Sequence, residues 1–185
     1  VSVGESIQDA IDAVPDGGTV AIAAGTYFET INSEGRSITI VGSGQAGSVI
    51  IDGEGVRRCV VVARGETAAT RFENLVFRHG VNQLDVDIDG NGDIDWWDLQ
   101  GAGGHVYEAS PTFVSCRFES NICSQSGGGI YIFGGSSSPE FIDCVFAENV
   151  SVKSGGGVSS YLSSAIFVDC DLTGNRSDSS LYGGG

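Results

Sequence analysis

Four segments of the chain repeat one pattern of apolar and polar positions. Three lie in the second half, PTFVSCRFESN from Pro111, PEFIDCVFAEN from Pro139 and AIFVDCDLTGN from Ala165, and TRFENLVFRHGVN from Thr70 fits the same pattern. Three positions stay apolar in every segment, and they hold Phe72, Phe113, Phe141 and Phe167, then Leu75, Cys116, Cys144 and Cys170, and finally Phe77, Phe118, Phe146 and Leu172. We expect these side chains to point into one shared interior.

A polar position between the first two apolar positions predicts a bend. It holds Asn74, Ser115, Asp143 and Asp169. The apolar positions on either side are three residues apart, which breaks the period of two of a straight strand. The second-half segments recur after 28 and 26 residues, SGGGI and SGGGV follow the first two of them, and YGGG begins at Tyr182. Short strands and glycine turns at this period are typical of a solenoid.

The first half carries strands of the same kind without the regular repeat. Apolar runs interrupted by glycine indicate buried parallel strands, and they read TVAIAAGTYFETI from Thr19, SITIVG from Ser37, SVIIDG from Ser48 and CVVVARG from Cys59. Residues 5–15 predict one short amphipathic helix, because Ser6 and Asp9 form a capping box and Pro15 stops the helix. This helix would cover the first turn of the coil and shield its unpaired backbone groups.

These patterns predict an all-β fold, a right-handed parallel β-helix of about six rungs with a short N-terminal capping helix. One domain spans residues 1–185, with its best-defined repeats over 111–185. The segment SIQDAIDAVPDGGTVAIAAGTYFETI resembles the opening of right-handed parallel β-helix proteins of the pectin-lyase-like class. The pairing of F-x-x-N with G-G-G-[IV] resembles the repeat of polymorphic outer-membrane-protein passengers and related secreted bacterial proteins. This resemblance implies a fold that carries enzymes, adhesins and structural stalks alike.

An acidic insertion over residues 85–98 interrupts the repeat. Phe77 and Phe118 are 41 residues apart, whereas the later repeats need 28 and 26. The insertion fits the twelve-residue frame of a calcium loop, with Gly92 at its sharp turn. The predicted Ca²⁺ ligands are Asp87, Asp89, Asn91, Asp93 through its carbonyl, Asp95 and Asp98. The alternative is an acidic loop that is solvated and holds no metal.

The insertion resembles most closely the calcium loop of dockerins, through Gly90 and Asp98. It departs from that family after Leu99, where QGAGG stands in place of a helix-forming segment, and it has no second copy. The resemblance therefore implies calcium binding without cohesin recognition. Trp96 and Trp97 either fold over the insertion, pack on the coil or form an exposed patch for a partner.

The cysteines predict thiols rather than a disulfide framework. Cys116, Cys144 and Cys170 should form an inward ladder, because equivalent positions on neighbouring rungs lie beyond disulfide range. Cys123 falls outside the pattern and either pairs with Cys59 or another neighbour, or stays free.

Asn149 and Asn175 begin the sequons NVS and NRS, so they are candidate glycosylation sites. Asn121 holds the same position in its repeat without a sequon. A second interpretation is that the turn itself needs an asparagine, whose side chain bonds nearby backbone and tolerates left-handed geometry. The two roles can coexist if the side chain faces outward.

The composition limits the partners of the protein. A net charge of −15, with Lys153 as the single lysine, disfavours nucleic acid and anionic membranes. No apolar run reaches the roughly 20 residues of a membrane span. We therefore expect a secreted or cell-surface protein without nucleic acid or membrane insertion, whose ligand is a glycan or another cell-surface molecule.

These observations favour a non-enzymatic structural or adhesive module stabilised by calcium. A first alternative is a filament subunit that self-associates head to tail, because LYGGG stops within a repeat and leaves the C-terminal end uncapped. A second is a carbohydrate-active enzyme, a polysaccharide lyase or hydrolase, which needs paired carboxylates such as Asp143 and Asp169. Ser115 and Asn74 hold the same position in their repeats, so we expect a structural role for those carboxylates and no enzymatic activity.

Overall fold

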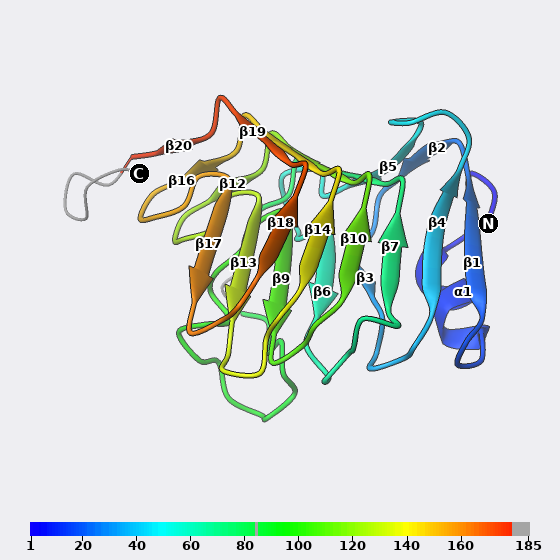
Figure 1. The fold of residues 1–185 in the computed structure, drawn as a ribbon, viewed down its shortest axis with the longest axis horizontal. Helices are drawn as coiled ribbons and strands as arrows, with labels where there is room; N and C mark the ends of the chain where they lie inside the picture. Colours follow the sequence, from blue (N-terminus) through cyan, green and yellow to red (C-terminus); the bar gives the residue numbers. More distant parts are fainter. Residues whose placement is uncertain (84, 179–185) are drawn as a thin grey trace.

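The computed structural model describes residues 1–83 and 85–178, and these residues form a parallel β-helix (Figure 1). Strands of successive turns stack side by side, and the single helix of the described residues, α1 (Ile7–Ala13), lies at the N-terminal end. The predicted all-β solenoid with its N-terminal helix is therefore confirmed. No helix in the described part of the chain is long and apolar enough to cross a membrane.

Four parallel sheets make up the coil. The first sheet holds β1 (Thr19–Ala23), β4 (Thr39–Ser43), β7 (Arg71–Glu73), β10 (Thr112–Val114), β14 (Glu140–Ile142) and β18 (Ile166–Val168). The second holds β2 (Gly25–Tyr27), β5 (Val49–Asp52), β8 (Val76–Arg78), β11 (Arg117–Glu119), β15 (Val145–Ala147) and β19 (Asp171–Thr173). The third holds β3 (Ile31–Asn32), β6 (Val60–Val62), β9 (Gly104–Tyr107), β13 (Ile130–Phe133) and β17 (Val158–Tyr161). A short fourth sheet holds β12 (Ile122–Cys123), β16 (Val150–Ser151) and β20 (Arg176–Ser177). Two sheets of six strands and one of five make a coil of about five turns, close to the roughly six rungs that the sequence predicted.

The repeated phenylalanines form ladders inside the coil, as their positions predicted. Phe113 pairs in register with Phe72 and Phe141, and its ring centroid lies 4.8 Å and 5.0 Å from theirs. All three rings are fully buried. Burial of one such ring contributes about 1.5–3 kcal/mol to folding, so the ladder is a main source of stability. The tail of the predicted pattern, Tyr182 to Gly185, lies outside the described residues.

The last described rung leaves part of its apolar surface in solvent. Phe167 and Leu172 are 40% and 55% exposed, although they hold the inward positions of β18 and β19. The reason is that no strand of residues 1–83 or 85–178 stacks on this rung.

The predicted bend is present in each of the four repeats. Asn74, Ser115, Asp143 and Asp169 all have left-handed backbone, with φ between 51° and 54°. Asparagine and aspartate tolerate this region better than most residues, which accounts for the small polar residues found there. Asp143 and Asp169 thus occupy the same corner as Asn74 and Ser115.

The N-terminal helix has the predicted cap. The hydroxyl of Ser6 accepts a hydrogen bond from the amide of Asp9 at 3.1 Å. Glu29, which follows β2, accepts from the amides of Ile7 and Gln8 at 2.9 and 3.0 Å, so the free amides of the first turn are satisfied. The side chains of Ile7 and Ile11, on the inner face of α1, are buried in the core.

Candidate functional site

The acidic insertion is a side loop that leaves the rungs undisturbed. It runs beside the C-terminal ends of β9, β13 and β17 as the green loop at the lower edge of Figure 1. Phe77 and Phe118 still stack, with ring centroids 4.9 Å apart, although the insertion separates them in sequence. Ile88 of the loop is buried against Val61 and Ala63 on the outer side of the coil.

The loop has a closed conformation that is set by its own carboxylates. Asp87 accepts hydrogen bonds from the amides of Gly90 and Gly92, both at 2.7 Å. Asp98 accepts from the amide of Asp95 at 2.7 Å and from that of Ile88 at 3.2 Å. The first and last residues of the predicted frame therefore curl the chain around one point.

Three of the six predicted ligands come together at this point. One carboxylate oxygen each from Asp87, Asp89 and Asp98 lies within 4.8 Å of the other two. Asp98 is fully buried, and no arginine, lysine or histidine of the described residues lies within ion-pair distance of its carboxylate. Burial raises the pKa of Asp98, and the charges of Asp89 and Asp87 raise it further. Hydrogen bonds from Gly92 and Gly90 lower the pKa of Asp87.

The other three predicted ligands lie at the exposed side of the loop. The side-chain nitrogen of Asn91 donates to the carboxylate of Asp95 at 2.9 Å and to that of Asp89 at 3.2 Å, and so bridges these two side chains. The side-chain oxygen of Asn91 accepts from the amide of Asp93 at 2.8 Å. The donor set contains only hard oxygen atoms, which fits Ca²⁺ or Mg²⁺ and excludes a preference for soft transition metals.

A buried arginine holds the base of the loop, and nothing in the sequence signalled it. Arg58 is fully buried before β6 and donates to the carbonyls of Gly101 at 2.8 Å and Gln100 at 3.0 Å, and to that of Asp98. Burial lowers the pKa of Arg58 to about 10, so the guanidinium stays charged at neutral pH. Beneath the loop, burial also lowers the pKa of His105 to about 3 and keeps that ring neutral. The loop is therefore tied to the coil by a charged group that binds backbone carbonyls.

The two tryptophans pack on the coil, one of the three alternatives. Tyr107, Phe133 and Tyr161 lie in register on the outer face of β9, β13 and β17, and we call them the outer aromatic column. The Trp97 ring stacks on Tyr107 at 5.9 Å, and the Trp96 ring lies 5.2 Å from Phe133. Trp96 nevertheless remains 50% exposed.

The repeated asparagines form a ladder that faces the interior. Asn149 donates to the carbonyl of Phe118 at 2.8 Å and to the side-chain oxygen of Asn175 at 2.9 Å, and it accepts from the side-chain nitrogen of Asn121 at 2.9 Å. Asn121 and Asn149 are fully buried. Both hydrogens of the Asn149 amide are thus engaged, and a glycan on this nitrogen would break the ladder. Glycosylation and the structural role cannot coexist at Asn149, because the side chain does not face outward.

The asparagines themselves do not take left-handed geometry, and that expectation was wrong. The residues before them do, namely Ser120, Glu148 and Gly174, with φ of 54°, 56° and 64°. The asparagines instead bond backbone and side chains of neighbouring rungs, which compensates for their burial.

Gly129, the last glycine of the triplet in SGGGI, lies close to a backbone carbonyl of the next rung and to the asparagine ladder. A Cβ atom at Gly103 would lie 2.6 Å from the Asn121 side-chain nitrogen, and one at Gly129 would lie 3.0 Å from that of Asn149. Only glycine leaves room for the asparagine of the same rung, so F-x-x-N and G-G-G-[IV] repeat together.

All five cysteines are free thiols, which rules out the Cys59–Cys123 pairing in this structure. Cys59 donates to the carbonyl of Arg78 at 3.2 Å and Cys123 to that of Ser126 at 3.2 Å. Burial raises the pKa of Cys59 to about 12 and that of Cys123 to about 11, so both remain protonated. Cys116 and Cys144 of the predicted inward ladder are fully buried, and Cys170, on the last described rung, packs against the same core but is only partly buried.

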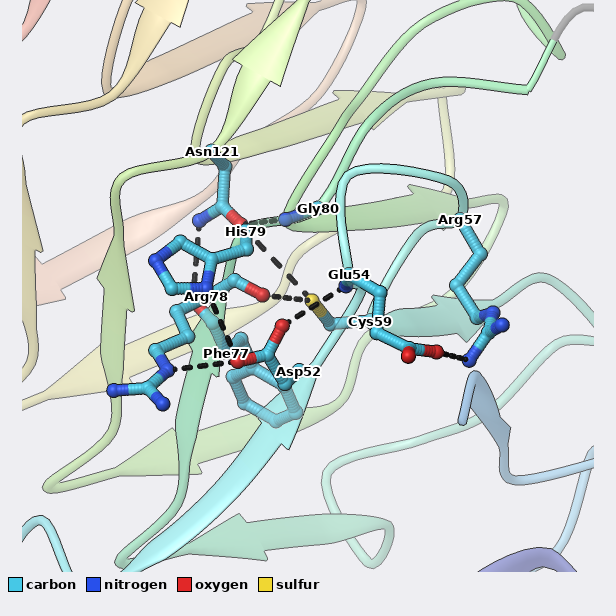
Figure 2. Close-up of polar contacts among 9 residues, drawn as sticks. All are labelled: Asp52, Glu54, Arg57, Cys59, Phe77, Arg78, His79, Gly80 and Asn121. Carbon is cyan, nitrogen blue, oxygen red and sulfur yellow. Dashed lines mark hydrogen bonds and ion pairs between the residues drawn. The ribbon is translucent and has the colours of Figure 1, made fainter. Parts of the chain in front are cut away.

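A second polar cluster, which the sequence did not reveal, surrounds Asp52 (Figure 2). Its carboxylate lies 3.0 Å from Arg78 Nε and 3.0 Å from His79 Nδ1, and accepts from the amide of Glu54 at 2.9 Å. Burial alone would raise the pKa of Asp52, but the hydrogen bonds from Glu54, Arg78 and His79 together lower it. The half-exposed His79 borders a hollow of about 380 Å³, which Ser120 also lines, yet no hydrogen bond joins these two side chains in the described structure. The contact with Asp52 orients the His79 ring.

Comparison with known protein families adds one match. Residues 115–132 match the repeat of the Chlamydia polymorphic membrane proteins. The matched segment contains Asn121 of the asparagine ladder and the triplet Gly127 to Gly129, whose last glycine lies against that ladder. No curated protein and no solved structure was found to match the chain.

Proposed function

We propose that this chain is a non-enzymatic structural or adhesive module of a cell surface, stabilised by calcium at the insertion. The repeat match supports a β-helix protein of the cell-surface, outer-membrane type. The solenoid supplies a rigid rod, and the insertion adds to it a loop whose carboxylates need a cation.

The observation that carries the calcium proposal is the convergence of Asp87, Asp89 and Asp98 within 4.8 Å. Three like charges at this distance repel one another, and one of them is buried, so a divalent cation would stabilise the closed loop. Asp87 and Asp98 already occupy the first and last places of a twelve-residue frame, so they would hold the ion together with Asp89.

Calorimetric titration with CaCl₂ tests this proposal. We expect one site per chain in the wild-type protein and loss of that site in Asp87→Ala and Asp98→Ala. Asp85→Ala is the matched control, because Asp85 is exposed in the same loop but lies outside the frame. If Asp87→Ala and Asp98→Ala bind calcium as well as Asp85→Ala does, the twelve-residue frame does not hold the ion and the acidic loop is only solvated.

A second candidate is a subunit that assembles head to tail. Phe167 and Leu172 on the last described rung are exposed, and either further chain or a second copy would cover apolar side chains there. Light scattering with and without calcium tests it, and a monomer at all concentrations would exclude it.

A further inference from the structure

A hollow beside the outer aromatic column combines aromatic and polar groups. Its volume of about 610 Å³ falls within the range of about 300–1,000 Å³ that is usual for small-ligand clefts. The side chains that matter here are Trp96, Ser126, Tyr131, Lys153, Ser159 and Tyr161. Ile130 and Ile132 of β13 face the core, so Tyr131 between them faces outward and the hollow opens on the outer face of the third sheet.

Two half-exposed rings form the aromatic wall of this hollow. Trp96 and Tyr161 are 50% and 52% exposed, and their ring centroids lie 6.0 Å apart at an interplanar angle of 71°. Both rings are held from behind by Phe133, at 5.2 Å and 5.7 Å. Rings fixed in this way offer flat apolar area at low entropic cost, and the C–H face of a sugar ring is a suitable partner.

The floor of the hollow carries groups that both donate and accept hydrogen bonds. Ser126 and Ser159 contribute hydroxyls, and the Ser154 hydroxyl lies 3.1 Å from that of Ser126. Gln100 fixes the arrangement, because it donates to the Trp96 carbonyl at 2.8 Å and accepts from the Ser126 amide at 2.9 Å. Hydroxyl groups of a sugar have the same dual character, so they match this floor.

The single lysine of the chain completes the hollow. Lys153 is exposed, and no carboxylate of residues 1–83 and 85–178 lies within ion-pair distance of it. In a chain with a net charge of −15, an unpaired cation beside two exposed rings marks a place for an anionic group.

We propose that this hollow binds an oligosaccharide that carries a carboxylate, with Trp96 and Tyr161 stacked on sugar rings and Lys153 paired with the carboxylate. The inference rests on the proposed adhesive function and names the class of its ligand. No reaction is involved.

Calorimetric titration of the full chain in calcium tests it, with two trimers of equal linkage, one of glucuronic acid and one of glucose. We expect the glucuronate trimer to bind about three- to fivefold more tightly, as one exposed ion pair allows. Trp96→Ala and Tyr161→Ala should each weaken both trimers roughly tenfold. Lys153→Gln should remove the preference and leave the glucose trimer unchanged. The tryptophan fluorescence gives a second readout, because Trp96 lines the hollow and the ring of Trp97, the other tryptophan of the chain, lies 5.5 Å from it.

Two control variants carry equivalent changes elsewhere. Phe28→Ala removes a 58% exposed ring beyond β2, and Arg71→Gln removes a cation from β7 of the first sheet; both should bind as wild type. The inference is overturned if neither trimer binds saturably, if both aromatic variants bind as wild type, or if Lys153→Gln keeps the preference. Calcium binding without trimer binding would overturn this inference alone, whereas trimer binding without a calcium site would overturn only the calcium proposal.

Discussion

Replacing Asn149 with alanine is expected to be among the most damaging single changes in this protein. The substitution removes four hydrogen bonds, namely those to the Phe118 carbonyl and the Asn175 oxygen, and those from the amide and side-chain nitrogens of Asn121. The Phe118 carbonyl and the Asn121 amide lose these bonds inside the coil, whereas the Asn175 oxygen keeps the Asn149 backbone amide and the Asn121 side-chain nitrogen keeps the Phe77 carbonyl. Each lost hydrogen bond costs about 1 kcal/mol. We therefore expect the free energy of unfolding to fall by about 4 kcal/mol.

Urea denaturation followed by circular dichroism, at fixed calcium, measures this change. Asn149→Asp tests the donating nitrogen of Asn149 separately from its accepting oxygen. It keeps an oxygen that accepts from Asn121, but it places a carboxylate oxygen against the Phe118 carbonyl. It should destabilise at least as much as Asn149→Ala at neutral pH. Asn32→Ala is the control, because its side chain accepts one hydrogen bond, from the Glu34 amide, and should cost about 1 kcal/mol or less. A loss below about 1 kcal/mol in Asn149→Ala would refute the ladder.

Three further changes test other parts of the structure. Phe113→Ala should cost about 3–5 kcal/mol in urea denaturation, because the ring is fully buried, whereas Phe28→Ala on the surface should stay within about 0.5 kcal/mol; equal losses would contradict the phenylalanine ladder. Arg58→Met should leave the carbonyls of Gln100 and Gly101 unpaired and speed amide hydrogen exchange in residues 85–98, while exchange in α1 stays unchanged. The lowered pKa of Asp52 contributes stability above its unfolded pKa of about 3.9, and that stability is lost as the pH falls through the folded pKa. Between pH 5 and pH 2, the Tm of Asp52→Asn should therefore fall less steeply than that of the wild-type protein. An equal fall of the two Tm values would argue against the hydrogen-bonded cluster.

The solenoid could be predicted because each rung repeats the same pattern of apolar and polar residues. Phe113, Cys116 and Phe118 hold inward positions that recur in every repeat, and Ser115 marks the bend between them. Side chains that meet one rung away are the same residue types at a fixed spacing, so comparing the repeats with one another is enough to find the contacts.

The direction of the asparagines was harder to predict. Asn149 and Asn175 stand in sequons, and a turn residue normally faces solvent. The signal that could have decided is the glycine that precedes each of these asparagines, such as Gly129 before Asn149, because a missing Cβ marks a close approach.

The contacts that hold the insertion on the coil could not be predicted at all. Arg58 and His105 are separated by the whole loop, and nothing in a single sequence says that a charged arginine is buried. The same holds for Asp52 and His79, which come from successive turns at positions where the repeats differ. Only the closed loop itself, from Asp87 to Asp98, could be predicted, because its contacts are local.

Thermal melting with and without calcium tests the central claim most directly. At a free calcium concentration 100 times its Kd, one site on the folded state adds about 2.7 kcal/mol, which raises the Tm of a domain of this size by about 5–10 °C. We predict that shift in wild-type protein and in Asp85→Ala, and its loss in Asp98→Ala. A Tm that calcium leaves unchanged, or one that rises equally in Asp98→Ala, would contradict the account.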